Sequence, residues 1–210
     1  MPVSPQPKAP AVGPFPEPET YGAELVPRLL SWYQASARDL PWRRTKDPYK
    51  IWVSEIMLQQ TGVEVVRGYY ERFLQALPTV RHLAAAEEGA VLKLWEGLGY
   101  YSRARNMMRS AKIILQRHGG RFPETYKEIR ALPGVGDYTA GAVASICFGE
   151  PRSAVDGNVL RVFSRLLARN FQTPGEKKRL ADFVTALCPP RCPGDFNQSL
   201  MELGALVCTP

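Results

Sequence analysis

The sequence predicts an all-α fold, on three observations. Apolar side chains recur at the three- and four-residue spacing of amphipathic helices along most of the chain. No segment alternates convincingly between apolar and polar residues with the two-residue period of a strand. Glycines, prolines and capping residues interrupt the helical spacing many times, so we expect short helices with many connections.

The N-terminal part is predicted to contain a disordered tail followed by two helices. Residues 1–20 include seven prolines, which prevent helix formation and leave too few apolar side chains to fold. From Glu24 onward, apolar side chains fall at helical spacing. Asp47 and Pro48 then have the residue types of an N-cap and a first helical position, and they start a second helix that stops at Gln59-Gln60.

Capping residues mark the starts of three further helices. Residues 61–64, Thr-Gly-Val-Glu, have the form of a capping box, in which Thr61 caps the next helix. Ser102 is expected to cap a basic amphipathic helix that has Arg103 among its polar positions, and Pro123 is expected to start the helix after it. The remaining helices are expected near residues 80–86, 90–95, 157–168, 176–187 and 196–207.

The segment at residues 132–141, LPGVGDYTAG, is predicted to form a helix-hairpin-helix. Pro133 ends the preceding helix, Gly134 and Gly136 allow positive φ values and expose backbone amides, and Asp137 is placed to N-cap the next helix. Such amides beside a helix N-terminus bind a phosphate oxygen without reading the base sequence. We therefore interpret the segment as a contact to a nucleic-acid backbone, although a Gly-x-Gly turn on its own is more often a tight connection between helices.

The composition is that of a soluble, intracellular globular protein with a polyanionic partner. The net charge of +7 and the isoelectric point near 9.4 favour such a partner, and 45% hydrophobic residues suffice for a sizeable core. No apolar run approaches the roughly 18 residues that span a membrane, and the chain does not open with a secretory leader. The four cysteines are expected as free thiols or metal ligands, since a large intracellular domain does not need disulfides.

Two carboxylates are candidates for catalysis: Glu55 on an otherwise apolar helix, and Asp156 in an Asp-Gly-Asn turn shortly after the hairpin helix. Burial raises the pKa of a carboxyl group, which suits Glu55 to act as a general acid. One protonated and one ionised carboxyl group that flank a sugar–base bond can hydrolyse it, because the first protonates the leaving group and the second stabilises the cationic sugar. The plainer alternatives are a solvated glutamate and a simple N-cap. No Ser/His/Asp set, ligand-spaced histidine pair or Walker loop is evident.

Several separate motifs occur in order: WVSEIMLQQT at 52–61, GLGYY at 97–101, LPGVGDYTAG at 132–141, VDGNV at 155–159, and FNQ with ELGA at 196–205. Together they resemble the A/G-specific adenine DNA glycosylases (MutY), a family within the helix-hairpin-helix DNA glycosylase superfamily. The resemblance covers almost everything from Gly22 to Pro210. It implies two helical lobes that flank a DNA-binding groove: a six-helix lobe at 44–154, which carries the hairpin, and a second lobe from 21–43 and 155–210.

The resemblance also implies roles for four residues at the active site. Glu55 matches the general acid that protonates adenine N7 and later helps to activate water, and Asp156 matches the carboxylate that stabilises the cationic sugar. Asn158 matches a residue that orients groups near that aspartate. Tyr138 stands where the related endonuclease III enzymes carry a Schiff-base lysine. Because a tyrosine cannot form that imine, the resemblance implies a monofunctional glycosylase without efficient strand-cleaving activity.

The contacts to DNA implied by the resemblance fall into three groups. Gln60 and Tyr100 match side chains that wedge into the duplex, which must be unstacked before the base can be reached. Arg43, Glu202, Arg38 and Trp42 match the wall of the adenine pocket. Thr61 and Leu98 are expected near the opposing 8-oxoguanine. The remaining expected DNA contacts are Gln59, and Gly134, Val135 and Gly136 in the hairpin.

The cysteines depart from the family's pattern. The resembling family holds a [4Fe-4S] cluster with four cysteines, of which Cys208 matches the first, whereas Cys188 and Cys192 match none. We therefore expect the cluster to be absent or incomplete in this chain. We also expect the 210 residues to correspond to the catalytic portion, since the family's C-terminal domain that checks for 8-oxoguanine has no counterpart in them.

The function that follows is removal of adenine opposite 8-oxoguanine or guanine in double-stranded DNA by a monomeric repair enzyme. It would act in the cytoplasm or nucleoid, or in the nucleus or mitochondrion. Two alternatives stay open. One is a related glycosylase that acts on an oxidised pyrimidine or a G·T mismatch, and the other is a module that binds distorted DNA without catalysis.

Overall fold

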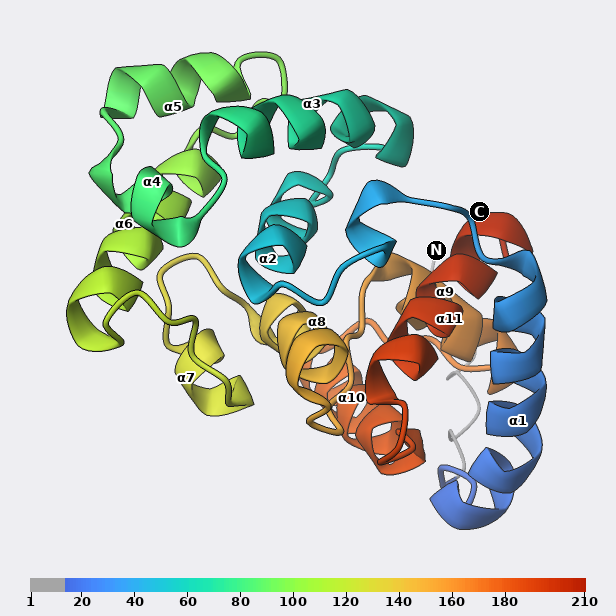
Figure 1. The fold of residues 1–210 in the computed structure, drawn as a ribbon. Helices are drawn as coiled ribbons and strands as arrows, with labels where there is room; N and C mark the ends of the chain where they lie inside the picture. Colours follow the sequence, from blue (N-terminus) through green and yellow to red (C-terminus); the bar gives the residue numbers. More distant parts are fainter. Residues whose placement is uncertain (1–13) are drawn as a thin grey trace, which may run out of the picture.

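The computed structural model describes residues 14–210, and this part of the chain folds into helices without any strand (Figure 1). The predicted all-α fold class is therefore confirmed. None of the helices in residues 14–210 is long and apolar enough to cross a membrane. The elements are α1 (Pro18–Ser36), the 3₁₀ helix η1 (Pro41–Arg43), α2 (Pro48–Met57), α3 (Val63–Ala76), α4 (Val80–Ala85), α5 (Glu88–Trp95), α6 (Ser102–Arg117), α7 (Tyr126–Arg130), α8 (Asp137–Phe148), α9 (Gly157–Leu166), α10 (Pro174–Leu187) and α11 (Pro193–Leu206).

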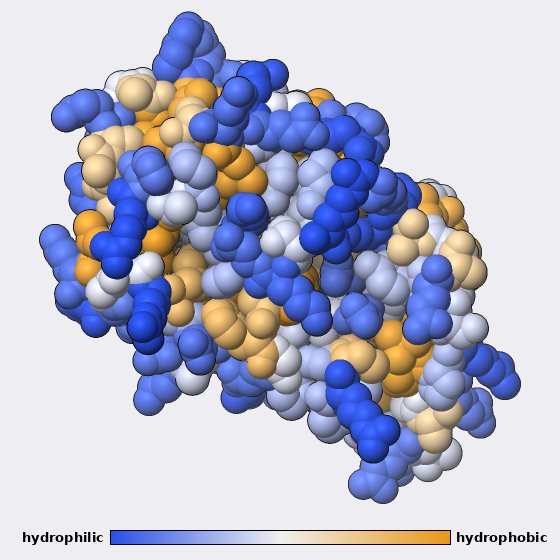
Figure 2. Space-filling model, in the orientation of Figure 1, coloured by the Kyte–Doolittle hydropathy of each residue, from blue (hydrophilic) through white to orange (hydrophobic). Residues whose placement is uncertain are grey.

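The buried apolar side chains form two clusters, one in each helical lobe. The first cluster is built by η1 and helices α2 to α8, and Trp52, Phe73 and Trp95 are fully buried in it. The second is built by α1 and α9 to α11, around Phe163 and Phe196. Helix α1 accordingly packs on α10 and α11, so the two ends of the described chain lie in the same lobe (Figure 1). Hydrophilic side chains cover most of the face that Figure 2 shows, with smaller apolar areas between them.

The described part of the predicted N-terminal tail is ordered at its end. Residues 1–13 lie outside the described residues. Pro18–Thr20 already belong to α1, so the prediction of a tail up to residue 20 is wrong there: a proline at the first helical position has no amide that the helix would use. The ring of Phe15 also packs against Phe183, with the ring centroids 5.0 Å apart.

Helix α2 begins as the sequence predicts. The carboxylate of Asp47 accepts hydrogen bonds from the amides of Tyr49 and Lys50, and Pro48 is the first helical residue. An N-cap of this kind stabilises a helix by about 1 kcal/mol. All residues from Ile51 to Met57 are buried, and α2 packs against both α3 and α8. Any polar side chain in this stretch is therefore held in apolar surroundings.

Two other predicted caps are wrong, and both lie where a loop leads into a helix. Gly62, not Thr61, is the N-cap of α3, because the Thr61 hydroxyl donates to the carbonyl oxygen of Gln59 instead. Ser102 is the first residue of α6 rather than its cap, since the chain already has helical φ and ψ angles at Tyr101. Neither side chain consequently caps the helix that begins there.

The hairpin helices also begin differently from the prediction. Helix α7 starts at Tyr126 instead of Pro123, because Thr125 and Glu128 form a complete capping box. Asp137 is the first residue of α8 and not its N-cap, which is Gly136. Its carboxylate instead accepts hydrogen bonds from Arg130 and from the hydroxyl of Tyr126, so it ties α7 to α8 across the turn.

Candidate active site

A cavity of about 670 Å³ is lined by residues of both lobes. Its walls come from the segment between α1 and α2, from α2 and the loop after it, and from the starts of α8 and α9, with α11 opposite. Most of the predicted site residues line it: Arg38, Trp42, Arg43, Glu55, Gln59, Gln60, Thr61, Gly136, Tyr138, Asp156, Asn158 and Glu202. The fold therefore brings together side chains that are far apart in the sequence.

Glu55 is the buried carboxyl group of this cavity. It lies on α2 and is only 5% exposed. Burial raises the pKa of Glu55 to about 7, the negative charge of Asp156 raises it as well, and the Tyr138 hydrogen bond and Arg43 oppose the rise. A carboxyl group with this pKa is half protonated near neutral pH, so it can give or take a proton there.

Tyr138 holds Glu55 from across the cavity. Its hydroxyl group donates a hydrogen bond of 2.6 Å to Oε2 of Glu55, and Sδ of Met201 lies 3.6 Å from the same hydroxyl. Burial and the nearby Glu55 keep the pKa of Tyr138 well above its ordinary value, so the hydroxyl remains protonated. One oxygen of Glu55 is thus occupied, which leaves Oε1 without a side-chain partner among the described residues.

Asp156 is both an N-cap and a wall of the cavity. Its Oδ1 accepts the amide of Val159 at 2.8 Å, which caps α9, and its Oδ2 accepts Nδ2 of Asn158 at 2.7 Å. The capping role matches the plainer alternative for this residue. Asp156 nonetheless lines the same cavity as Glu55, so the cap does not remove it from the site.

The segment that carries Asp156 is fixed from two sides. A Cβ added at Gly141 of α8 would lie 2.0 Å from the carbonyl oxygen of Ser153, so only glycine lets the segment pass this helix. Asn197 of α11 is fully buried, accepts the amide of Ala154 at 2.9 Å and donates to the carbonyl oxygen of Arg152 at 2.7 Å. Asn197 belongs to the FNQ motif at 196–198, but the sequence alone does not predict its hydrogen bonds.

Glu202 closes the far wall of the cavity with two arginines. The carboxylate is 1% exposed and accepts two side-chain hydrogen bonds from Arg38, two from Arg43, and the backbone amide of Arg38. Burial alone would raise the pKa of Glu202, but the hydrogen bonds of Arg38 and Arg43 outweigh it and lower the pKa to about 2. Glu202 is therefore charged at neutral pH and joins α11 to η1.

The two predicted wedge residues lie on separate loops with an unusual backbone. Gln60 has φ of 59° and Tyr100 has φ of 45°. Both values lie in the left-handed region, which residues other than glycine rarely adopt. Gln60 lines the cavity and is exposed, and Tyr100 is 65% exposed and lies outside the cavity lining. Leu98, by contrast, is 6% exposed and belongs to the first apolar cluster, so its side chain is not presented to a partner.

The hairpin turn presents backbone rather than side chains. Gly134 has φ of 76° and Gly134 and Gly136 are both exposed, whereas Val135 is 4% exposed and packs in the first cluster. Gly136 has φ of −90°, so it does not use the positive φ that glycine allows. Gly134 alone takes the left-handed conformation, and a Cβ there would lie 2.6 Å from Asn106.

Arg103 is a buried residue whose place the sequence does not predict. It was expected at a polar position of an amphipathic helix, but it is only 8% exposed. Its guanidinium group donates to backbone carbonyl oxygens both at the end of α2 and in the loop before α6. Helical periodicity could not reveal this, because the acceptors lie more than forty residues away on α2.

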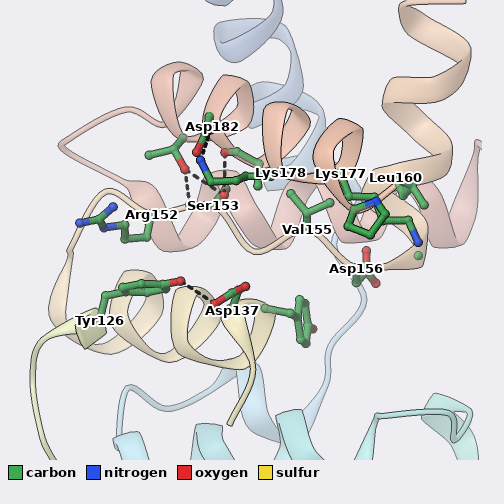
Figure 3. Close-up of a pocket in the computed structure, with 15 residues that line it drawn as sticks. Tyr126, Asp137, Arg152, Ser153, Val155, Asp156, Leu160, Lys177, Lys178 and Asp182 are labelled. Carbon is green, nitrogen blue, oxygen red and sulfur yellow. Dashed lines mark hydrogen bonds and ion pairs between the residues drawn. The ribbon is translucent and has the colours of Figure 1, made fainter. Parts of the chain in front are cut away.

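A second groove, of about 710 Å³, shares Tyr138, Asp156 and Gly157 with the cavity (Figure 3). Figure 3 shows Asp137 of α8 facing the α10 side chains Lys178 and Asp182 across this groove. Lys178 and Asp182 form an ion pair of 3.2 Å, so part of the charge in the groove is already balanced. The three shared residues consequently line two hollows of the molecular surface.

The four cysteines do not gather into one group among the described residues. The residues from 14 to 210 contain no group of three or more His, Cys, Asp or Glu side chains placed to hold a metal ion. Cys208 lies at the end of α11, where Arg165 reaches its sulfur at 3.3 Å and Arg161 its carbonyl oxygen at 2.7 Å. Burial raises the pKa of both Cys147 and Cys188 to about 12, so both thiols are protonated at neutral pH when no metal is bound.

Sequence comparisons match this chain to DNA glycosylases and other base excision DNA repair proteins. The sequence profile of the HhH-GPD superfamily of base excision DNA repair proteins matches residues 53–186. The chain is 48% identical over 193 residues to an adenine DNA glycosylase of Rattus norvegicus, and the match covers 87% of this chain and 37% of the rat protein. The adenine DNA glycosylase of Homo sapiens is 47% identical, with 87% of this chain and 35% of the human protein covered. The chain thus spans little more than a third of the length of these relatives.

Two solved structures have folds similar to that of this chain. A thermostable thymine-DNA glycosylase matches with a TM-score of 0.80 and 30% identity, over 91% of this chain and 89% of that one. An endonuclease III, trapped as a covalent intermediate with DNA, matches with a TM-score of 0.79 and 19% identity, over 93% of this chain and 90% of that one. The second likeness concerns the fold alone.

Proposed function

Since the chain belongs to the HhH-GPD superfamily of base excision DNA repair proteins, we propose that it is a monofunctional glycosylase that removes adenine opposite 8-oxoguanine or guanine. The observation that carries this proposal is the buried Glu55, with a pKa of about 7, in one cavity with Asp156. The enzyme would act as a monomer on double-stranded DNA, in whichever compartment holds the genome: cytoplasm or nucleoid, or nucleus or mitochondrion.

Glu55 would supply the proton for the leaving base. With the Tyr138 hydroxyl bound to Oε2, the proton of the neutral Glu55 is carried on Oε1 and can pass to N7 of an adenine in the cavity. Protonation draws electrons toward the base, so the bond between base and sugar breaks and neutral adenine departs. The ionised Glu55 then takes a proton from the water that attacks the sugar, which restores the acid.

Asp156 would stabilise the cationic sugar between these two steps. Its carboxylate lines the cavity, and its two oxygen atoms accept hydrogen bonds from the Val159 amide and the Asn158 side chain. A fixed charge in a water-poor site stabilises a developing cation without the cost of reorienting solvent. Asn158 is the residue that fixes the direction of Oδ2.

Two parts of the surface would hold the DNA. The exposed amides around Gly134 and Gly136 suit a phosphate oxygen, which would fix the duplex without reading its sequence. Gln60 and Tyr100 would enter the duplex beside the lesion and hold the gap that the extruded base leaves. The wall of Arg38, Arg43, Trp42 and Glu202 would bound the extruded base.

Tyr138 supports a hydrolytic rather than a lyase reaction. A lyase of this superfamily would need an amine that attacks the sugar carbon, and the phenol at position 138 is held protonated against Glu55. The reaction would therefore end with an abasic site and an intact strand.

We propose that residues 1–210 by themselves do not retain a [4Fe-4S] cluster. Support comes from the single matching ligand, Cys208, and from the absence of a ligand group among the described residues. Iron and acid-labile sulfide measured on the purified 210-residue chain would test this. Near four irons per chain would contradict it, and a trace amount would agree with it.

A panel of duplexes tests the proposed activity. The purified protein is incubated with A·8-oxoguanine, A·G, T·G and oxidised-pyrimidine duplexes, and the released base and strand breaks are measured separately. We expect free adenine from the first two, and strand breaks only after alkali treatment. Release of thymine or of an oxidised pyrimidine would favour the related glycosylases, and binding without any released base would favour a module that only recognises distorted DNA.

A further inference from the structure

Arg103 joins the end of α2 to a loop that is distant in the sequence. Its Nη1 atom lies 2.9 Å from the carbonyl oxygen of Ile56, 3.0 Å from that of Met57 and 2.6 Å from that of Gln59. The first two of these residues directly follow Glu55 on α2. One nitrogen of a buried guanidinium group therefore holds the turn by which the chain leaves this helix.

The other terminal nitrogen of Arg103 holds the loop before α6. Nη2 donates to the carbonyl oxygens of Leu98 at 2.9 Å and Gly99 at 3.3 Å, and reaches the hydroxyl of Thr61 at 3.5 Å. The guanidinium carbon also lies 5.8 Å from the ring centroid of Tyr100. The same planar group thus fixes residues 58–61 and residues 97–100 relative to each other.

Each of these loops contains a residue with a costly backbone. Gln60 and Tyr100 have left-handed φ values, and Ala168 is the one other non-glycine residue between 14 and 210 that does. Such conformations persist only where the surrounding contacts impose them, and they cluster at active sites and ligand clamps. The contacts of Arg103 to the carbonyl groups of Gln59 and Gly99, one residue before each, supply that constraint.

We infer that Arg103 is a positioning residue that holds the exposed side chains of Gln60 and Tyr100 as a rigid pair for extruding the base from the duplex. The inference rests on the proposed function and names the residue that prepares its first step. A lysine cannot replace Arg103, because a single ammonium group cannot donate in two fixed directions as the guanidinium fork does. Extrusion is therefore expected to suffer while the protonation chemistry at Glu55 is kept.

The test compares Arg103→Lys with Arg117→Lys, the same substitution at the exposed end of the same helix. Extrusion is followed by the fluorescence of 2-aminopurine placed at the adenine position, which rises when the base leaves the stack. Adenine release is measured with saturating enzyme over a pH series. For Arg103→Lys we expect extrusion and release to be slower by about 10- to 100-fold, with duplex affinity within a few-fold and the pH midpoint of release unchanged. Arg117→Lys should match the wild type in all three measurements.

Two results for Arg103→Lys would overturn the inference: normal extrusion, whether or not adenine release is slower, and a shifted pH midpoint of release. If Arg103→Lys does not fold, Gly99→Ala tests the same loop, because Gly99 has φ of 69° and open space for a Cβ. This variant should fold and slow extrusion, and unchanged extrusion would count against the inference. A wild-type protein that releases no adenine would instead refute the proposed function, so the two failures are distinguishable.

Discussion

Tyr138 and Glu55, 83 positions apart in the sequence, are joined by a hydrogen bond of 2.6 Å between the phenol hydroxyl and Oε2. This bond lowers the pKa of Glu55, whereas burial raises it to about 7. The tyrosine therefore limits how far the pKa of the proposed acid rises, and it turns the carboxyl group so that its second oxygen is available to a base.

Tyr138→Phe is expected to raise the pKa of Glu55 further, because the variant loses the hydrogen bond and keeps the burial. Adenine release requires the protonated acid, so it falls as the pH rises through this pKa. The fall should move to higher pH in the variant, as measured by single-turnover release between pH 5 and pH 9. An unchanged midpoint would show that the group titrating in this range is not Glu55.

Glu55→Gln is expected to change how stability depends on pH. The folded-state pKa of about 7 lies above the ordinary value of 4.5, so the stabilising contribution is complete below pH 4.5 and is lost as the pH rises through about 7. The variant lacks this loss. It should be more stable than the wild type at pH 9, by up to roughly 3 kcal/mol from the pKa difference. Urea unfolding of the wild type and the variant at pH 5 and pH 9 measures their free energies of unfolding. If these free energies differed by the same amount at both pH values, the raised pKa of Glu55 would be contradicted.

Asp156→Asn separates the two roles of Asp156. Asparagine caps a helix about as well as aspartate, so α9 and the melting temperature should be nearly unchanged. The neutral amide cannot stabilise a cationic sugar, and adenine release should fall by about 10²- to 10³-fold. Duplex affinity, measured by fluorescence anisotropy, should be retained. Loss of binding in parallel with the rate would instead make Asp156 a structural cap only.

Gly134→Ala is expected to disturb the hairpin more than Gly136→Ala. Alanine at 134 would need a left-handed φ and would meet Asn106, whereas Gly136 has an ordinary φ and open space around it. The first variant should therefore be less stable, by about 1 kcal/mol or more, and should bind all duplexes more weakly by a similar factor. The second should keep its melting temperature. A change in preference among opposing bases at either position would mean that the hairpin reads the lesion.

The sequence predicted those features that depend on residues close to one another in the chain. Asp47 and Pro48 started α2 as expected, and the apolar residues around Glu55 indicated that it would be buried. The hairpin followed from Pro133 and its two glycines, although which glycine takes the positive φ depends on how the turn packs against Asn106. These features are encoded within a few residues of one another, and the spacing of the sequence is enough to recognise them.

Features that depend on distant partners could not be predicted. Asp137 has the residue type of a cap, but Arg130 and Tyr126 compete for its carboxylate once the hairpin closes. Arg103 occupies a polar position in the helical pattern, yet the carbonyl groups of α2 and of the preceding loop draw it into the interior. Long-range hydrogen bonds of this kind leave no periodic trace, because their acceptors are backbone atoms, which every residue has.

The most direct test of the account compares adenine release by the wild type and by Glu55→Gln from an A·8-oxoguanine duplex under single-turnover conditions at pH 7. The amide keeps the shape of the side chain but cannot donate the proton that the leaving base requires. We expect the wild type to release free adenine, and the variant to bind the duplex with similar affinity and release adenine at least about 10³-fold more slowly. Release by the variant within a factor of about ten of the wild type, or no adenine from the wild type, would contradict the account.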